Sequence, residues 1–258
     1  MAPIWPTRGL LRSGVVTTRY PRRADDYGAT WPGEIEVVGS DSGDASLADV
    51  CPTGAIESSS RGVSVDRGRC ILCGRCADAR PDVFRFSWTV EVSTLARGAL
   101  VAPDGDGDES SVREVREALA GRVRALRRSV HIRHVDCGSD GSDEWEIAAL
   151  TNPVYDVQRL GIFFTASPRH ADILLATGVG ARGMRAPLER VYEAMPDPRV
   201  VIAAGTDAVS GGMIAPTYAT LGGVGSVVPV DVWVPGSPPT PFGLLHGILL
   251  AIGAVPSR

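Results

Sequence analysis

The sequence predicts an α/β domain with a parallel sheet in its second half and a small α+β domain in its first half. Three apolar runs are predicted to be strands, at 130–135, 172–176 and 199–204. Between the last two, the segment 186–194 carries its apolar residues at helical spacing. Strands that are apolar throughout are typical of a parallel sheet covered on both faces. Residues 1–98 instead show short β-type runs between Gly, Pro and Asp clusters, which is typical of a small mixed domain.

The remaining elements follow in chain order. In the first half, strands are expected at 34–38, 63–65 and 89–92. An acidic, turn-rich stretch at 103–111 is expected to be a linker, and Ser110 or Ser111 could then cap a helix that carries Val112, Val115, Leu119, Val123 and Leu126. The longest apolar stretch, 242–255, is interrupted by His246, and its length suits a packed helix rather than a membrane span.

Composition narrows the possible functions. The chain has 258 residues, with 44% hydrophobic and 22% charged side chains, which is ordinary globular composition. Its net charge of -4 argues against a general nucleic-acid-binding role, since that role needs a strongly basic surface. The N-terminal segment breaks its apolar residues with Pro3, Pro6 and Gly9, so no signal peptide is expected. We therefore expect a soluble or peripheral protein.

The five cysteines are the most informative residues. Three of them, Cys70, Cys73 and Cys76, have C-x2-C-x2-C spacing, Cys51 precedes them, and Cys137 stands alone. An odd number of cysteines with this spacing indicates metal binding in a reducing compartment rather than a disulfide framework. We expect Cys137 to be structural.

The offsets of these cysteines match one iron–sulfur site. Bacterial-type ferredoxins use the run C-x2-C-x2-C-x3-C-P twice, and the fourth cysteine of each run binds the cluster of the other run. By that rule Cys70, Cys73, Cys76 and Cys51, which Pro52 follows, would hold one complete 4Fe-4S cluster. The ligand positions of a second cluster fall on four other residues: Asp41, Asp44, Leu47 and Arg80. A zinc site or four buried cysteines are the alternatives, although zinc more usually takes two C-x2-C pairs.

Around this run the chain resembles a known family. The segment 9–21 (GLLRSGVVTTRYP), followed by the cysteines, is similar to the two-cluster ferredoxin subunit of complex I and of membrane-bound group 4 NiFe hydrogenases. The resemblance covers about residues 5–95. It implies a 4Fe-4S ferredoxin-like domain over residues 1–98, followed by a linker and helix over 99–128.

Residues 129–258 resemble the 20 kDa-type small subunit of the same complexes, which implies a flavodoxin-like α/β domain. The resemblance rests on 152–156 (NPVYD), 167–172 (SPRHAD), 192–196 (YEAMP) and 235–239 (PGSPP). The segment 136–147 (DCGSDGSDEWEI) corresponds to the part that carries two ligand cysteines in the family. The residues at the four ligand positions are not cysteines: Asp140, Asp143, Asp207 and Ser237.

Carboxylate and hydroxyl oxygens suit hard cations rather than iron–sulfur clusters, so no cluster is expected at these four positions. The aspartates could form a solvated or arginine-paired pocket. They could instead form a Mg²⁺- or Ca²⁺-type site or a proton-binding site, together with Glu146, which the resemblance associates with proton movement.

The resemblance implies an iron–sulfur subunit of a complex I-like or energy-converting hydrogenase-related complex, with electron transfer through one 4Fe-4S cluster and no catalytic residue of its own. The partners implied are a large-subunit homologue of the hydrogenase/49 kDa type and membrane subunits, and nucleic acid is not among them. The implied location is cytoplasmic, peripheral at the inner face of the bacterial cell membrane, with membrane contact only through partners. The alternative is a redox-silent scaffold subunit of an ion- or solute-transporting assembly.

Overall fold

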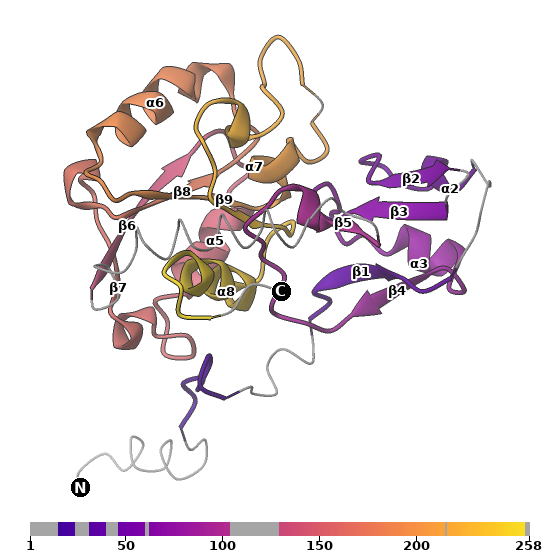
Figure 1. Cartoon of the computed structure of the whole chain (residues 1–258), viewed down its shortest axis with the longest axis horizontal. Helices are drawn as coiled ribbons and strands as arrows, with labels where there is room; N and C mark the ends of the chain where they lie inside the picture. Colours follow the sequence, from indigo (N-terminus) through magenta and orange to yellow (C-terminus); the bar gives the residue numbers. More distant parts are fainter. Residues whose placement is uncertain are drawn as a thin grey trace, which may run out of the picture.

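The computed structural model describes residues 15–23, 31–39, 46–59, 62–103, 129–214 and 216–255. Figure 1 shows a parallel-sheet domain on one side of the molecule and a smaller antiparallel region on the other. The helix predicted after Ser110 or Ser111 and nearly all of the predicted linker lie outside the described residues, as do Asp41 and Asp44.

The five-stranded sheet confirms the predicted parallel α/β domain. Its order is β10-β9-β8-β6-β7, and every neighbouring pair is parallel. The strands are β6 (Val130–Asp136), β7 (Ile162–Phe164), β8 (Ile173–Thr177), β9 (Val200–Ala204) and β10 (Val232–Val234). Numbered within the domain, the order is 2-1-3-4-5, which is the doubly wound order of flavodoxin-like sheets. Connections leave β6 and β8 in opposite directions, so the carboxyl ends of these two strands form the switch point where such folds bind ligands.

Helices cover both faces of this sheet (Figure 1). One face packs on α5 (Ser142–Ala149) and α8 (Pro241–Ala251), and the other on α6 (Arg185–Ala194) and α7 (Thr206–Ser210). Successive residues of β8 alternate between the two cores, because side chains of a strand point to opposite faces. The short 3-10 helices of the chain are η2 (Gly98–Leu100), η3 (Val157–Leu160), η4 (Pro168–His170), η5 (Arg182–Met184) and η6 (Val224–Ser226).

The first half contains two antiparallel sheets. β1 (Glu34–Val37) pairs with β4 (Phe84–Ser87), and β3 (Gly62–Asp66) lies between β2 (Ile56–Ser59) and β5 (Val101–Ala102). Two short helices complete this region, α2 (Ser46–Asp49) and α3 (Arg75–Ala79). The strands predicted at 34–38 and 63–65 are therefore confirmed.

The strand predicted at 89–92 is wrong. The pairing of β4 with β1 ends at Ser87, and residues 89–92 form no strand. The chain instead turns toward α8, where Val92 lies against Gly243 and the Ser93 hydroxyl donates to the Gly243 carbonyl at 3.1 Å. The apolar residues in this segment serve helix packing, a use that period-2 patterning does not distinguish from a strand.

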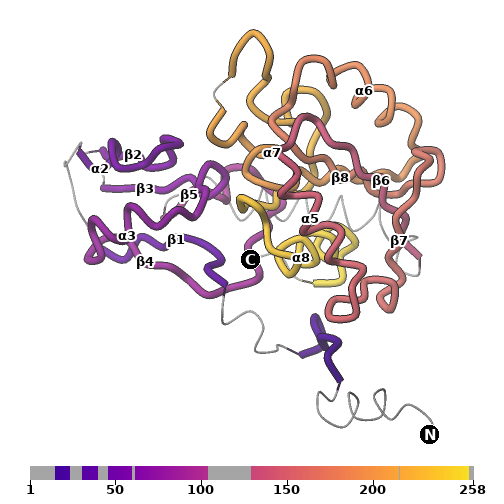
Figure 2. The backbone as a smooth tube through the Cα atoms, turned by 180° about the vertical axis from the view of Figure 1, so that it is seen from behind, coloured from indigo at the N-terminus to yellow at the C-terminus, as the bar shows by residue number. Residues whose placement is uncertain are grey.

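Several segments of the first half pack on the parallel-sheet domain. Thr94 pairs with Trp233 of β10, and the Tyr20 ring meets Phe242 of α8 edge-on, with ring centroids 6.0 Å apart. Viewed from behind, α7 lies between the parallel sheet and the antiparallel region (Figure 2). There the Thr206 hydroxyl donates to the Cys70 carbonyl at 3.0 Å. Among the described residues, no helix combines the length and apolar character that a membrane span requires.

Candidate metal centre

Four of the five cysteines line one pocket. Cys51 follows α2, Cys70 follows the turn after β3, and Cys73 and Cys76 come from the loop and first turn of α3. The rest of the pocket lining is mostly apolar: Ile35, Val50, Ala55, Ile56, Val65 and Ile71. Two separate segments of the chain thus bring together the four cysteines that the ferredoxin offsets select. Cys137 is elsewhere, buried at the end of β6.

The loop between the cysteines has an unusual backbone. Leu72 has φ 54° and Gly74 has φ 79°, so a leucine adopts the left-handed conformation that usually requires glycine. Such a conformation costs about 1–3 kcal/mol and persists where the surrounding structure requires it. Successive left-handed and right-handed residues turn backbone N–H groups toward one side, which creates a concave site for negative charge.

N–H donors already point at the sulfur atoms. The Leu72 N–H donates to Cys70 Sγ at 3.4 Å, and the Ala55 N–H donates to Cys51 Sγ at 3.2 Å. The Thr53 hydroxyl lies 3.4 Å from Cys51 Sγ. Such donors stabilise thiolates and set the potential of clusters that thiolates bind.

The thiols influence one another's ionisation. Burial raises the pKa of Cys70 to about 12, and the neighbouring charges of Cys76, Cys51 and Cys73 act in the same direction. Burial is also the main cause that raises the pKa of Cys76. For Cys51, burial acts upward, but hydrogen bonds from Thr53 and Ala55 outweigh it and the pKa is lowered. Four thiolates this close need a positively charged group among them, which is what metal coordination supplies.

The donors of the pocket are of the type that an iron–sulfur cluster takes. Within the described ranges, no three or more His, Cys, Asp or Glu side chains surround one metal-ion position. A zinc ion would draw its sulfur ligands together, each at about 2.3 Å from the metal. In a cubane, each cysteine binds a different iron, so the sulfurs stay further apart around a pocket. Thiol donors, N–H groups aimed at sulfur and apolar walls fit that group.

Two of the positions expected for ligands of a second ferredoxin cluster are described, and their side chains make other contacts. Leu47 is 3% exposed and packs in the core of the first half with Ile35 and Phe84. Arg80 ends α3 and forms a bidentate ion pair with Asp82, with N–O distances of 2.9 and 2.8 Å. Neither residue lines the cysteine pocket.

The aspartates at the family's ligand positions lie at the carboxyl end of the parallel sheet, beside the switch point. Asp143 is in the first turn of α5 and only 4% exposed, whereas Asp140 is exposed. Asp207 is in the first turn of α7 and half-buried. Ser237 is exposed, on a loop whose residue Gly236 accepts a hydrogen bond from the Thr206 N–H at 2.7 Å.

We define the acidic cluster as Asp140, Asp143 and Asp207. The pKa values of these three aspartates are shifted in different directions. Burial, followed by the charges of Asp207, Glu144, Asp140 and Asp136, raises the pKa of Asp143 to about 8. Burial and then the charge of Asp140 raise the pKa of Asp207. Asp140 differs, because hydrogen bonds from the Ser142 hydroxyl and N–H lower its pKa.

Glu146 has its pKa raised by burial alone. It is not among the charges that act most strongly on Asp143 or Asp207. Among the described residues, these carboxylates form no group of three or more side chains that could hold a metal ion, and the cation or proton site stays a prediction.

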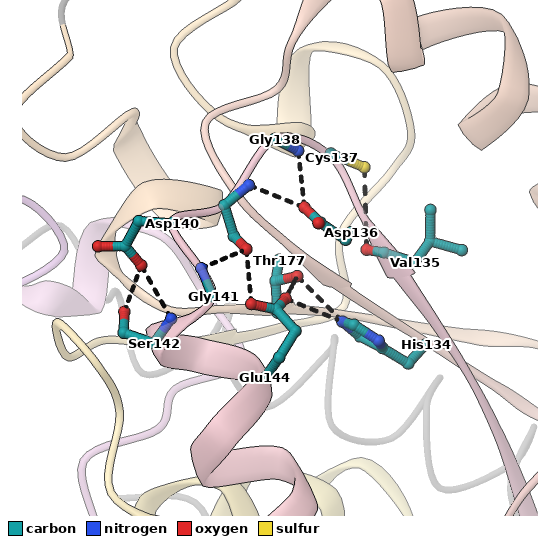
Figure 3. A network of polar contacts seen from close by, with 11 residues as sticks. His134, Val135, Asp136, Cys137, Gly138, Asp140, Gly141, Ser142, Glu144 and Thr177 are labelled. Atoms are coloured by element: carbon teal, nitrogen blue, oxygen red, sulfur yellow. Dashed lines mark hydrogen bonds and ion pairs between the residues drawn. The ribbon is translucent and has the colours of Figure 1, made fainter.

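Sequence reasoning missed a polar network beside the acidic cluster (Figure 3). The Glu144 carboxylate accepts from the Thr177 hydroxyl at 2.6 Å and from the Ser139 hydroxyl at 2.5 Å. His134 Nε2 lies 3.0 Å from the same threonine oxygen and 3.4 Å from Glu144. The network joins the ends of β6 and β8 to α5, and no spacing rule in the sequence connects positions 134, 144 and 177. Thr206 was not predicted either, and its only signal in the sequence is that it precedes Asp207.

Two family models match the chain. Residues 140–251 match the model described as "NADH ubiquinone oxidoreductase, 20 Kd subunit", and residues 63–120 match the model described as "4Fe-4S single cluster domain". The second match includes Cys70, Cys73 and Cys76 but not Cys51.

Curated relatives match as well. The chain is 42% identical over 139 residues to formate hydrogenlyase subunit 7 of Escherichia coli, over 54% of each chain. It is 37% identical over 145 residues to the probable membrane-bound hydrogenase subunit mbhJ of Pyrococcus furiosus, over 56% of this chain and 87% of that protein. It is 47% identical over 95 residues to a subunit of the NADH-quinone oxidoreductase of Aquifex aeolicus, over 37% of this chain and 52% of that protein.

A solved structure is also similar, that of the membrane-bound sulfane sulfur reductase, an archaeal respiratory membrane complex. The TM-score is 0.44 at 28% identity, over 52% of this chain and 77% of that chain. The chain spans about half the length of the first and third curated relatives. Its match to most of the second relative, together with the family model over residues 140–251, shows that the chain belongs to the family of the NADH ubiquinone oxidoreductase 20 kDa subunit.

Proposed function

We propose that the protein is an iron–sulfur subunit of a membrane-associated complex I-like or hydrogenase-related complex. In this proposal it transfers electrons one at a time through a single 4Fe-4S cluster held by Cys51, Cys70, Cys73 and Cys76. The observation that carries the proposal is the pocket that these four cysteines line together, although two separate segments contribute them.

The match to a 4Fe-4S single cluster domain supports the same site from three of its ligands. Cys51 lies outside that match, so its assignment depends on the pocket and on the crossover rule of ferredoxin ligation. When bound, the cluster supplies a one-electron redox centre. The N–H groups of Ala55 and Leu72 would stabilise its thiolates, and the apolar side chains of Ile35, Val65 and Ile71 would exclude water from it.

The names of the relatives support the type of assembly. Two are named as subunits of formate hydrogenlyase and of a probable membrane-bound hydrogenase, and one as a subunit of NADH-quinone oxidoreductase. We propose that residues 1–98 form a ferredoxin-like domain, which residues 99–128 join to the 20 kDa-type domain over 129–258. A large-subunit homologue and membrane subunits would be its partners, at the inner face of the bacterial cell membrane.

A redox-silent scaffold is the second candidate, and a specific observation favours it. Electron transfer over a long distance uses successive centres, yet the described positions of two further clusters hold no cysteine. Leu47 is packed in a core, Arg80 is paired with Asp82, and aspartates occupy the family's ligand positions on α5 and α7. In that case the cluster would stabilise its domain without changing its redox state.

A redox titration followed by EPR, on protein purified anaerobically with its complex, separates the two candidates. An electron carrier shows a signal that appears on reduction and disappears when the partner subunits re-oxidise it. A cluster that never changes state in the intact complex would reject electron transfer and leave the scaffold.

A further inference from the structure

The turn that presents Cys70 is fastened by an arginine from a distant segment. Arg97 forms a bidentate ion pair with Asp66, the last residue of β3, with N–O distances of 2.8 and 2.7 Å. The same carboxylate accepts from the N–H of Gly68, two residues before Cys70, at 2.9 Å. Because two parallel N–H···O bonds fix direction as well as distance, the pair holds the Asp66 carboxylate in one orientation.

Backbone hydrogen bonds connect Asp66 to Cys70 through the turn. The Arg69 N–H donates to the Asp66 carbonyl at 3.0 Å, and the Cys70 N–H donates to the Arg67 carbonyl at 3.2 Å. The Arg67 side chain is directed to β1 instead, where it pairs with Glu34 at 3.0 Å. Within the described residues, Arg97 therefore supplies the counter-charge of Asp66, and the position of the turn follows from that pair.

The turn is also in direct contact with Arg97 and with α7. A Cβ atom placed on Gly68 would lie 2.8 Å from the guanidinium carbon of Arg97 and 2.7 Å from a methyl carbon of Val209 on α7. From the same helix, the Thr206 hydroxyl donates to the Cys70 carbonyl at 3.0 Å. There is thus little free space in which the turn could change its position without moving Arg97 or α7.

The segment that carries Arg97 is anchored on the parallel-sheet domain. Thr94 exchanges two backbone hydrogen bonds with Trp233 of β10, at 3.0 and 2.8 Å. Leu95 is 4% exposed and belongs to the core that contains α8, whereas Leu100 is 1% exposed and belongs to the core on the opposite face of the sheet. Arg97 therefore lies, in the sequence, between two residues that are buried in the parallel-sheet domain.

We propose that Arg97 is a positioning residue for Cys70, and that the parallel-sheet domain controls the geometry of the cysteine site through it. The proposal deepens the proposed function and rests on it, because the controlled property is that of the bound cluster. The parallel-sheet domain contributes none of the four cysteines, yet Arg97 and α7 connect it to the turn that carries one of them. A partner subunit that shifts this domain would therefore move a cluster ligand and change the potential of the cluster.

EPR spectra and redox titrations of the anaerobically purified holoprotein test this positioning. Arg97→Ala removes both bonds to Asp66, so we expect altered g-values and a shifted potential in the cluster that remains bound. Arg97→Lys keeps the positive charge but loses the planar pair of donors, so its spectrum should stay altered. The control is Arg85→Ala, which removes an exposed ion pair with Glu36 in the same half and should leave the wild-type spectrum.

Two outcomes overturn the proposal. One is a spectrum and potential of Arg97→Ala that equal those of the wild type. The other is a wild-type spectrum in Arg97→Lys, since positive charge alone would then suffice. Should Arg97→Ala fail to fold, Asp66→Asn replaces it, because it keeps an acceptor oxygen for Gly68 and loses the ion pair. An unaltered spectrum in that variant equally overturns the proposal.

Amide hydrogen exchange of the full chain tests the same contact independently of the cluster. In Arg97→Ala, the amides of residues 67–70 should exchange about tenfold faster than in the wild type, because the turn opens more often without the charged bonds. The amides of β8 should exchange at the wild-type rate. Equal exchange at residues 67–70 overturns the role of Arg97. A wild-type protein that holds no iron–sulfur cluster overturns the proposed function, while the exchange rates still decide whether Arg97 holds the turn.

Discussion

The cysteine pocket and the acidic cluster both lie close to the start of α7, where Thr206 donates to the Cys70 carbonyl and Gly205 lies against Asp143, and each gathers ionisable groups of one kind. They differ in what surrounds those groups. The pocket has apolar walls and N–H groups aimed at two of its sulfurs. In the acidic cluster, the Gly205 backbone lies against Asp143, and no donor within the described residues reaches its carboxyl group. The first region suits a positively charged group of several atoms, whereas the second holds a carboxyl group, that of Asp143, whose pKa is raised by burial and neighbouring charges.

The largest expected effect comes from the cysteines. Cys51→Ser or Cys73→Ser should remove most of the bound iron, because a hard hydroxyl oxygen replaces a soft thiolate ligand. Cys137→Ala is the matched control, since this buried thiol is outside the pocket. Iron content and visible absorption after anaerobic purification measure the effect. Full iron retention in Cys51→Ser would show that Cys51 is not a cluster ligand. It would also contradict the difference in metal binding between the cysteine pocket and the acidic cluster.

The next effect concerns Asp143 and pH. Its pKa is about 8 in the folded protein and about 3.9 in an unfolded chain, so the folded state binds the additional proton between these values. Stability is therefore lost as pH rises from about 4 to about 8. Asp143→Asn should raise the free energy of unfolding at pH 8 by about 1–3 kcal/mol and flatten its pH dependence. Chemical denaturation at pH 5 and pH 8 measures this, and an equal pH dependence in both proteins would contradict it.

A smaller effect is expected at Gly205. Its φ is 92°, and a Cβ atom there would overlap the Asp143 carboxyl group, so Gly205→Ala should destabilise the protein by about 1–3 kcal/mol. Gly183→Ala is the control, because a Cβ there meets no atom within 4 Å. Thermal unfolding of both variants compares the two sites. Equal melting temperatures would mean that the Gly205 backbone does not lie close to the Asp143 carboxyl group.

The smallest expected effect is at Thr206. Thr206→Val removes the donor to Cys70 and the acceptor for Gly236, and should cost about 1–2 kcal/mol. Thr206→Ser should restore both bonds, and Thr151→Val, at an exposed hydroxyl, should change stability by less than about 0.5 kcal/mol. The EPR spectrum of the holoprotein is a second measurement. A spectrum that differs in Thr206→Val and recovers in Thr206→Ser would show that this bond positions the cysteine loop.

Much of the fold could be predicted because its strands are apolar along their whole length. The runs at 130–135, 172–176 and 199–204 are the central strands β6, β8 and β9. The offsets of a ferredoxin run also selected the four cysteines that line one pocket, across the separation between Cys51 and Cys70. Both signals are local patterns whose chemistry leaves few alternatives.

The rest depended on contacts that local patterns do not encode. Asp140 and Asp143 stand three residues apart with the same side chain, yet Asp140 is exposed and accepts from Ser142, whereas Asp143 is only 4% exposed. The bond between Thr206 and Cys70 joins positions 136 residues apart. Such contacts follow from how the two halves pack, and their energies are set by burial rather than by residue type.

The iron and acid-labile sulfide content of the anaerobically purified protein tests the central claim most directly. A single cluster held by Cys51, Cys70, Cys73 and Cys76 predicts about four iron and about four sulfide ions per chain. Zinc in place of iron, or about eight iron ions per chain, would contradict it.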